Sequence, residues 1–308
     1  MQDVKLDNLE LFYDYMDESN NLLYEIYHKP YFELIEMSAA NLLAGEILND
    51  VDEDSRKKLN KIYKKIAKVD FSVEDVRKAM QSIILRGFKE MNIPNGSTTP
   101  DTIGIFIAYL ITKLCPSKNI SICDPLCGTG NMLLTIANHL DKNVSLSACD
   151  QDIWMTKLIK IQADLISTNV DIYFQNALSL YLKDIDVVTF DMPHSINTDK
   201  GYFPYQAILH FADYVKENGS MIGVVENDFF DYDKNQEFKK ELLSKMTIIG
   251  IVELPDNMFK NTKPKIILVL RKKIEDKKCF MVKLPSFEDV KKFNESLIEI
   301  EAWFEKNK

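Results

Sequence analysis

Through the first part of the chain, hydrophobic residues recur every three or four positions, the spacing that places them on one face of an α-helix. Ser72 followed by Asp75 is typical of a helix N-terminus, where the two residues cap each other's backbone N–H groups. Turn-forming residues then cluster between Ile93 and Pro100, which indicates a domain boundary. The pattern predicts an all-helical N-terminal domain at residues 1–92, with helices over 7–27, 31–48, 55–68 and 72–90.

Beyond residue 93 the pattern changes to short apolar runs that alternate with helical segments. Such alternation is typical of right-handed crossovers and a mostly parallel sheet covered on both faces. The segment 254–265 is short and has no helical pattern, so we expect the last of seven strands to be antiparallel. We therefore predict that residues 93–308 form an α/β domain built on a seven-stranded, mostly parallel, Rossmann-like sheet. The predicted strands are 120–123, 144–149, 170–174, 186–190, 221–225, 248–253 and 266–270, with helices at 102–114, 131–140, 153–167, 205–216 and 235–245. A further strand near 280–284 and a helix over 287–304 complete the chain.

The amino-acid composition indicates the class of protein and the compartment in which we expect it. The 308 residues are 46% hydrophobic and 28% charged, which is ordinary for a globular protein. The longest uncharged apolar run, 103–111, is much shorter than the ~20 residues that cross a bilayer, and the N-terminal sequence does not resemble a secretory signal. Five scattered cysteines favour reduced thiols, and Cys123 with Cys127 lacks a second ligand pair for a metal. We expect a cytoplasmic protein with no membrane association and no metal.

The charges of the chain allow two interpretations of the predicted helix 55–68. The net charge is −9, whereas proteins that grip nucleic acid by themselves usually carry a basic surplus. The predicted helix 55–68 is nevertheless rich in lysine, with Leu59, Ile62 and Ile66 between the basic residues. Its basic side chains form either a face that contacts phosphates or the solvated face of an amphipathic helix, and the acidic background favours the second.

The segment Asp124-Pro-Leu-Cys-Gly-Thr-Gly-Asn131 lies between a predicted strand and a predicted helix. Its glycines allow the backbone to approach a ligand closely. A loop that binds pyrophosphate uses bare N–H groups, and the carboxylate of Asp124 would repel the phosphates. Leu133 also takes the place of the third glycine of a dinucleotide-binding loop, which argues against a nicotinamide-dependent oxidoreductase. S-adenosylmethionine, which has an ammonium and a sulfonium but no phosphate, fits this loop better.

Three further strand ends carry polar side chains, where ligands bind in open α/β sheets. Asp150 ends the second strand at a spacing suited to the two ribose hydroxyls, the alternative being a helix-capping or solvated residue. Asn176 follows the third strand and is either an adenine-binding side chain or a turn residue. The fourth strand ends in Asp191-Met-Pro-His194.

Taken together, these motifs resemble the class I S-adenosylmethionine-dependent methyltransferases, and among them the adenine-N6 DNA methyltransferases such as the modification subunits of type I restriction systems. The likeness rests on 97–103, 124–131, 251–259 and 266–271 and spans roughly residues 95 to 275. It implies S-adenosylmethionine as cofactor. The cofactor-binding residues that it implies are Thr99, Pro100, Asp124, Pro125, Cys127, Gly128, Gly130, Asn131, Asp150, Asn176 and Asp191.

The catalytic motif of this family is Asn or Asp, then Pro, Pro and an aromatic residue. Its first side chain and the next carbonyl accept hydrogen bonds from the target amino group, and the ring stacks on the extruded base. The resemblance thus implies catalytic roles for Asp191, Pro193 and His194, but Met192 replaces the first proline and His194 the aromatic residue. Aromatic residues at 202, 203 and 205 either supply the missing ring or pack within the fold.

The leading hypothesis is an N-methyltransferase that modifies DNA adenine. Fewer than forty residues follow residue 271, which is too few for an ordinary base-reading domain, so DNA would bind weakly or through a partner subunit. The altered motif supports an alternative, a catalytically impaired scaffold that binds the cofactor or a partner. A methyltransferase acting on a protein glutamine or on RNA is a third interpretation, and the oligomeric state stays open.

Overall fold

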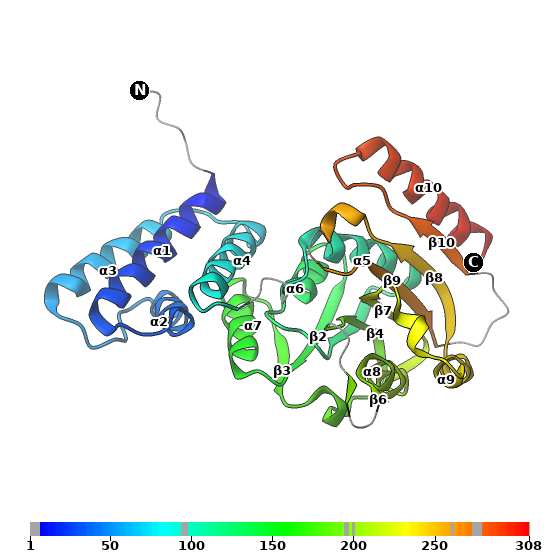
Figure 1. Ribbon diagram of the computed structural model, residues 1–308. Coiled ribbons are helices and arrows are strands. Elements are labelled where there is room, and N and C mark those ends of the chain that lie inside the picture. The colour runs from blue at the N-terminus through cyan, green and yellow to red at the C-terminus, as the bar shows by residue number, and fades with distance from the viewer. Residues whose placement is uncertain are drawn as a thin grey trace.

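The computed structural model describes residues 7–93, 98–193, 197–198, 201–259, 262–272 and 279–307 (Figure 1). The N-terminal part is all-helical, as predicted, and Asp7, Asp52 and Ser72 cap three of its helices. Helix α2 ends before the expected residue 48, because Gly45 takes a left-handed conformation with φ of 70° and terminates it. The helices of this part are α1 (Asn8–Tyr27), α2 (Tyr31–Ala44), α3 (Glu53–Ile66) and α4 (Val73–Glu90).

The rest of the chain forms the predicted α/β unit around an eight-stranded sheet. The spatial order is β10-β8-β9-β7-β4-β1-β2-β3, and within the described residues β9 is the one strand of this sheet that runs antiparallel to its neighbours. The eighth strand is the further strand expected near residue 280, and it pairs in parallel with β8 at the edge. The strands are β1 (Asn119–Asp124), β2 (Asn143–Asp150), β3 (Val170–Phe174), β4 (Ile185–Asp191), β7 (Val215–Glu226), β8 (Thr247–Glu253), β9 (Lys265–Arg271) and β10 (Phe280–Lys283), and the short β5 (Asn197–Thr198) pairs with β6 (Gly201–Tyr202).

Both faces of the sheet are buried, which explains the continuous apolar runs of its strands. Along β9, Ile267 and Val269 belong to one hydrophobic core, and Leu268 and Leu270 belong to the other. Helices α5 (Asp101–Leu114), α6 (Asn131–Asn138), α7 (Ile153–Leu165) and α10 (Val290–Lys306) contribute to the first core, and α8 (Phe203–Ala212) and α9 (Glu237–Lys245) to the second. Short 3-10 turns are found at Ala177–Ser179, Phe229–Tyr232 and Asp256–Met258.

The expected helix 205–216 is displaced toward the N-terminus. Helix α8 ends at Ala212, and β7 already begins at Val215, which pairs with Ile185. Asn218, with φ of 63°, then bulges the strand before Ser220 resumes the pairing with β4. The prediction was wrong here because an irregular strand start has no clear period of two.

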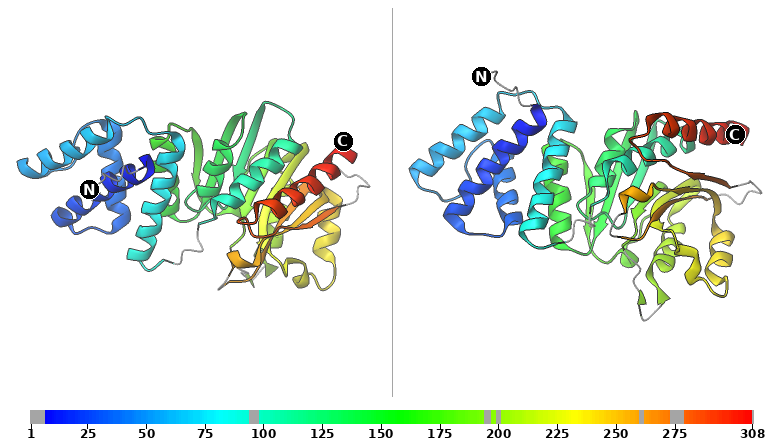
Figure 2. Two further views of the ribbon diagram at one scale, coloured as in Figure 1. Left: turned by 90° about the horizontal axis from the view of Figure 1, so that it is seen from above. Right: turned by 45° about the horizontal axis from the view of Figure 1, so that its top comes forward.

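The helical unit packs against the side of the α/β unit formed by α6 and α7, and α10 lies near the opposite edge of the sheet (Figures 1 and 2). Phe32 of α2 contacts Trp154 of α7, with ring centroids 6.0 Å apart. None of the described helices is both long and apolar enough to cross a membrane.

Candidate functional site

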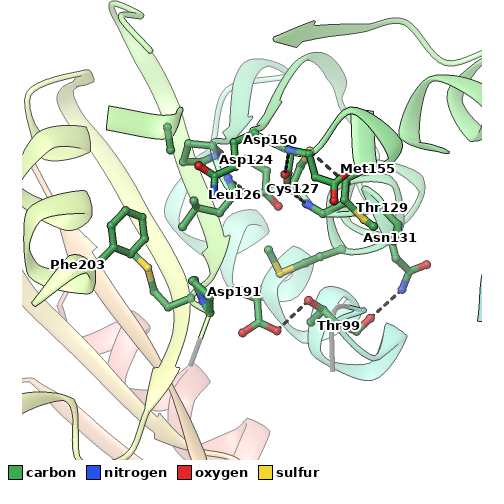
Figure 3. A pocket seen from close by; sticks show the side chains of 18 of the residues that line it. Thr99, Asp124, Leu126, Cys127, Thr129, Asn131, Asp150, Met155, Asp191 and Phe203 are labelled. Atoms are coloured by element: carbon green, nitrogen blue, oxygen red, sulfur yellow. Dashed lines mark hydrogen bonds between the residues drawn. The ribbon is translucent and has the colours of Figure 1, made fainter. Parts of the chain in front are cut away.

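A cavity of about 730 Å³ opens at the carboxyl ends of β1, β2 and β4 (Figure 3). Its volume is that of a typical small-molecule site. Because β9 is antiparallel, the beginning of this strand lies at the same edge and adds Lys265 to the wall. The lining is Ile93, Thr99, Asp124, Pro125, Leu126, Cys127, Gly128, Thr129, Asn131, Met132, Asp150, Gln151, Asp152, Met155, Asn176, Ala177, Asp191, Met192, Pro193, Phe203 and Lys265.

Most of the predicted site residues meet in this cavity. Pro100 and Gly130 do not belong to its described lining: Pro100 precedes the first turn of α5, and Gly130 lies at the start of α6. His194 falls outside the described residues. The lining residues that the sequence predicted are Thr99, Asp124, Pro125, Cys127, Gly128, Asn131, Asp150, Asn176, Asp191 and Pro193.

The glycine loop is hydrogen-bonded to the end of β2. Both glycines are left-handed, with φ of 51° at Gly128 and 81° at Gly130. The N–H of Gly128 donates to Asp150 Oδ2 at 2.9 Å, and the N–H of Cys127 donates to the carbonyl of Cys149 at 3.0 Å. These bonds hold the loop backbone in the wall of the cavity, where a ligand can approach it.

Gly130 is required for packing as well as for conformation. A Cβ atom at this position would lie 2.3 Å from Cγ1 of Ile159 on α7. We expect Gly130→Ala to lower the free energy of unfolding by about 3 kcal/mol, since a left-handed alanine costs about 1 kcal/mol and overpacking adds 1–3 kcal/mol. Gly45→Ala is the matched control, because Gly45 is left-handed but has open space around its Cβ position, so it should lose only about 1 kcal/mol. Urea unfolding of both variants measures the difference, and equal losses would contradict the packing role.

Two carboxyl groups lie on one side of the cavity, at the ends of β1 and β2 (Figure 3). Asp124 is 1% exposed and accepts a hydrogen bond from the N–H of Leu126 at 3.1 Å. Burial, with a smaller contribution from the carboxylates of Asp191 and Asp150, raises the pKa of Asp124 to about 8. Burial also raises the pKa of Asp150, although this side chain accepts bonds from the N–H groups of Gly128 and Asp152.

The two asparagines of the lining are already engaged by the protein. Asn131 is 2% exposed, and its amide bonds to Arg77, Thr99 and Asp101. Asn176 Oδ1 accepts the N–H of Leu178 at 2.8 Å, which is the turn role that the sequence left open beside adenine binding.

Asp191 lies on the other side of the cavity, and both of its carboxylate oxygens have donors. The hydroxyl of Thr99 donates to Oδ2 at 2.9 Å (Figure 3), and the ammonium of Lys265 donates to Oδ1 at 2.7 Å. The side chains of Asp191 and Lys265 are only 16% and 12% exposed. Lys265 was not among the predicted site residues, although the predicted antiparallel direction of the last strand places the start of that strand at this edge.

The structure separates the three aromatic candidates. Tyr202 stacks on Tyr232 with ring centroids 4.3 Å apart, and Tyr205 stacks on Phe238 at 3.8 Å. Phe203 is half-buried and lines the cavity. Among these three aromatic residues, Phe203 is therefore the one whose ring a molecule bound in this cavity can contact.

The charges of the lining fit a cationic ligand without phosphates. Four of its side chains are carboxyl groups, at Asp124, Asp150, Asp152 and Asp191, and Lys265 is the one Lys or Arg in the described lining. Lys265 is paired with Asp191, so it offers no free positive charge to a pyrophosphate. The described residues contain no group of three or more His, Cys, Asp or Glu side chains arranged for a metal ion.

Comparisons with known proteins agree with this fold. A family described as N-6 DNA Methylase matches residues 194–302, and one described as YtxK N-terminal helical domain matches residues 10–88. A Bacillus subtilis protein named uncharacterized protein YtxK is 27% identical, with 83% of this chain and 84% of that protein covered.

Two solved structures extend the comparison. A candidate class I S-adenosylmethionine-dependent methyltransferase of Listeria monocytogenes is 29% identical, with a TM-score of 0.87 over 96% of this chain and 99% of that one. The methyltransferase subunit of a type I restriction-modification system from Streptococcus thermophilus is 15% identical, with a TM-score of 0.62 over 95% of this chain and 74% of that one, and so shares the fold. The chain therefore has the class I S-adenosylmethionine-dependent methyltransferase fold and resembles the adenine-N6 DNA methyltransferases, including the methyltransferase subunits of type I restriction-modification systems.

Proposed function

We propose that this protein is an S-adenosylmethionine-dependent methyltransferase that modifies an amino nitrogen, with adenine N6 of DNA as the acceptor. The observation that carries the proposal is a cavity that contains both the acidic glycine loop and Asp191. We assign residues 1–92 to a helical domain and 93–308 to the methyltransferase domain, and we place the protein in the cytoplasm.

The cofactor would lie along the glycine loop. Asp124 at the floor of the cavity would attract its positive charges, and Asp150 would accept hydrogen bonds from the ribose hydroxyls. Asp150 keeps lone pairs for this role, because a carboxylate has about four acceptor sites and two are used by backbone N–H groups. When bound, S-adenosylmethionine supplies the electrophilic methyl group.

The acceptor would enter between Asp191 and Phe203. Asp191 and the carbonyl of Met192 would accept the two N–H groups of the target, so that the nitrogen lone pair faces the methyl donor. Phe203 would take the stacking role that the family gives to the aromatic residue at the position of His194. We propose that DNA is bound weakly or through a partner subunit, because the net charge of −9 disfavours tight binding of nucleic acid by this chain alone.

The test is incubation of the protein with methyl-labelled S-adenosylmethionine and separate DNA, RNA and protein fractions. Label in N6-methyladenine of DNA supports the proposal. Label only in RNA or in a protein glutamine would overturn the DNA assignment while retaining methyl transfer, and no label in any fraction would overturn the enzymatic proposal.

The bond between Lys265 and Asp191 favours a second candidate, a cofactor-binding scaffold without transfer. In this candidate the Lys265 ammonium takes the carboxylate oxygen that would otherwise orient the acceptor. It predicts that the wild type binds S-adenosylmethionine without transfer, and that Lys265→Met gains labelled product at least tenfold above background. Lys263→Met is the matched control, since Lys263 pairs with Glu226 and Asp228 and is not part of the described lining. Transfer by the wild type contradicts this candidate.

A further inference from the structure

A buried arginine of the helical unit bonds to residues in and beside the wall of the cavity. We propose that Arg77 of α4 is a positioning residue that holds the start of α6 and the segment bearing Thr99 in the geometry needed for cofactor binding. The proposal rests on the function proposed above for the cavity. It assigns the helical unit a part in the site, although the cavity itself is formed almost wholly by the α/β unit.

Arg77 is fully buried, and all five of its N–H donors are used. Nε and Nη2 donate to the carboxylate of Glu74 at 2.8 and 2.7 Å. Nη1 and Nη2 donate to the carboxylate of Asp101 at 3.2 and 2.6 Å, and Nη1 also donates to Asn131 Oδ1 at 2.9 Å. A lysine has three donors on one nitrogen and cannot reproduce this planar set of bonds.

The charges around Arg77 keep this arrangement intact. Burial alone would raise the pKa of Glu74 and Asp101, but hydrogen bonds and charge from Arg77 lower both. Arg77 in turn has a raised pKa, because its bonds to these two carboxylates outweigh its own burial. All three groups therefore stay ionised over the physiological range.

Asn131 connects Arg77 to Thr99, which lines the cavity. An arginine only donates, so the amide of Asn131 must turn Oδ1 toward Arg77 and Nδ2 away from it. Nδ2 then donates to the carbonyl of Thr99 at 2.8 Å and to Asp101 at 2.9 Å. The hydroxyl of the same threonine donates to Asp191, and Figure 3 shows these bonds of Thr99 to Asn131 and Asp191. Hydrogen bonds therefore connect Arg77 of α4, through Asn131 and Thr99, to the acid at the end of β4.

Arg86 shows that an ion pair within the helical unit need not involve the cavity. It lies on the same helix α4, pairs with Asp17 of α1 and has a side chain that is 29% exposed. Its described hydrogen bonds go to Asp17 and Asn21 of α1, and it also forms an ion pair with Glu90 of α4 at 3.6 Å. Arg77, in contrast, bonds to the first residues of α5 and α6, which flank the glycine loop and the Thr99 segment.

Binding of S-adenosylmethionine to full-length variants tests the proposal. Isothermal titration compares the wild type with Arg77→Gln, Arg77→Lys and Arg86→Gln, each first shown to be folded by circular dichroism and thermal unfolding. We expect both Arg77 variants to raise Kd about tenfold and Arg86→Gln to change it less than twofold. Arg77→Lys keeps the buried positive charge, so this variant keeps the test valid if Arg77→Gln does not fold. Unchanged Kd in folded Arg77 variants, or an equal rise in Arg86→Gln, would overturn the proposal.

A measurement without cofactor separates this inference from the proposed function. The N–H groups of Ile103 and Leu134 bond to the carbonyls of Pro100 and Gly130 in the first turns of α5 and α6. Hydrogen exchange at these amides should speed up at least fivefold in Arg77→Lys and stay unchanged in Arg86→Gln. If the wild type does not bind S-adenosylmethionine, the proposed function fails, and this exchange difference still decides whether Arg77 positions the two helix starts. Unchanged exchange in Arg77→Lys contradicts the inference.

Discussion

Replacing Asp191 with alanine should lower methyl transfer at least 100-fold and leave the affinity for S-adenosylmethionine within about threefold of the wild type. The side chain lies on the side of the cavity away from Asp124 and Asp150, so its loss removes orientation of the acceptor and spares the cofactor loop. Misplacement of a reacting group by about 1 Å can cost about 100-fold in rate. Single-turnover transfer of a labelled methyl group, with a parallel measurement of cofactor Kd, gives both quantities.

Asp186→Ala is the control for the loss of an ion-paired aspartate. Asp186 lies at the other end of the same strand β4, where it pairs with Lys216 and accepts hydrogen bonds from Ser121. We expect this variant to lose stability and to keep its rate of transfer per folded molecule. An Asp191→Ala variant that transfers methyl groups as fast as Asp186→Ala would exclude an orienting role for Asp191.

The sequence predicted the fold well because its strongest signals are local. Apolar runs, helical periods and caps such as Ser72 depend on neighbours along the chain, and the structure confirms both the helical unit and the mostly parallel sheet. The strand ends at Asp124, Asp150 and Asp191 also meet as expected, since parallel strands bring their carboxyl ends to one edge.

The parts that the sequence did not predict depend on contacts between distant residues. Lys265 reaches Asp191 across 74 positions, and Arg77 reaches Asn131 across 54. A lysine at the start of a strand and an arginine within a helix have no local pattern that reveals such partners. The sequence likewise could not choose among Tyr202, Phe203 and Tyr205, because the choice is made by packing against Tyr232 and Phe238.

The affinity for S-adenosylmethionine should rise with pH, as Asp124 changes from neutral to ionised. The pKa of this buried carboxyl is about 8 in the free protein, so it is protonated below that value. A cationic ligand favours the carboxylate, so binding releases a proton and Kd falls as the pH approaches 8. From pH 6 to pH 7.5 the expected fall is roughly 20-fold for a single group with that pKa. The α-amino group of the ligand, with a pKa of about 7.7–8.0, keeps most of its charge in this window.

Asp124→Asn removes the titrating group and is nearly isosteric. Its Kd should vary less than threefold between pH 6 and pH 7.5 and should exceed that of the wild type most clearly at the higher pH. Titration calorimetry in two buffers of different ionisation enthalpy measures the released proton directly, and we expect close to one per site in the wild type at pH 6.5 and fewer in the variant. The pKa of Asp150 is also raised, so any pH dependence of Kd that remains in Asp124→Asn would come from Asp150. A wild-type Kd that does not depend on pH, with no proton released, would mean that Asp124 stays neutral beside the ligand, and it would exclude a role for the charge of Asp124 in attracting the cation.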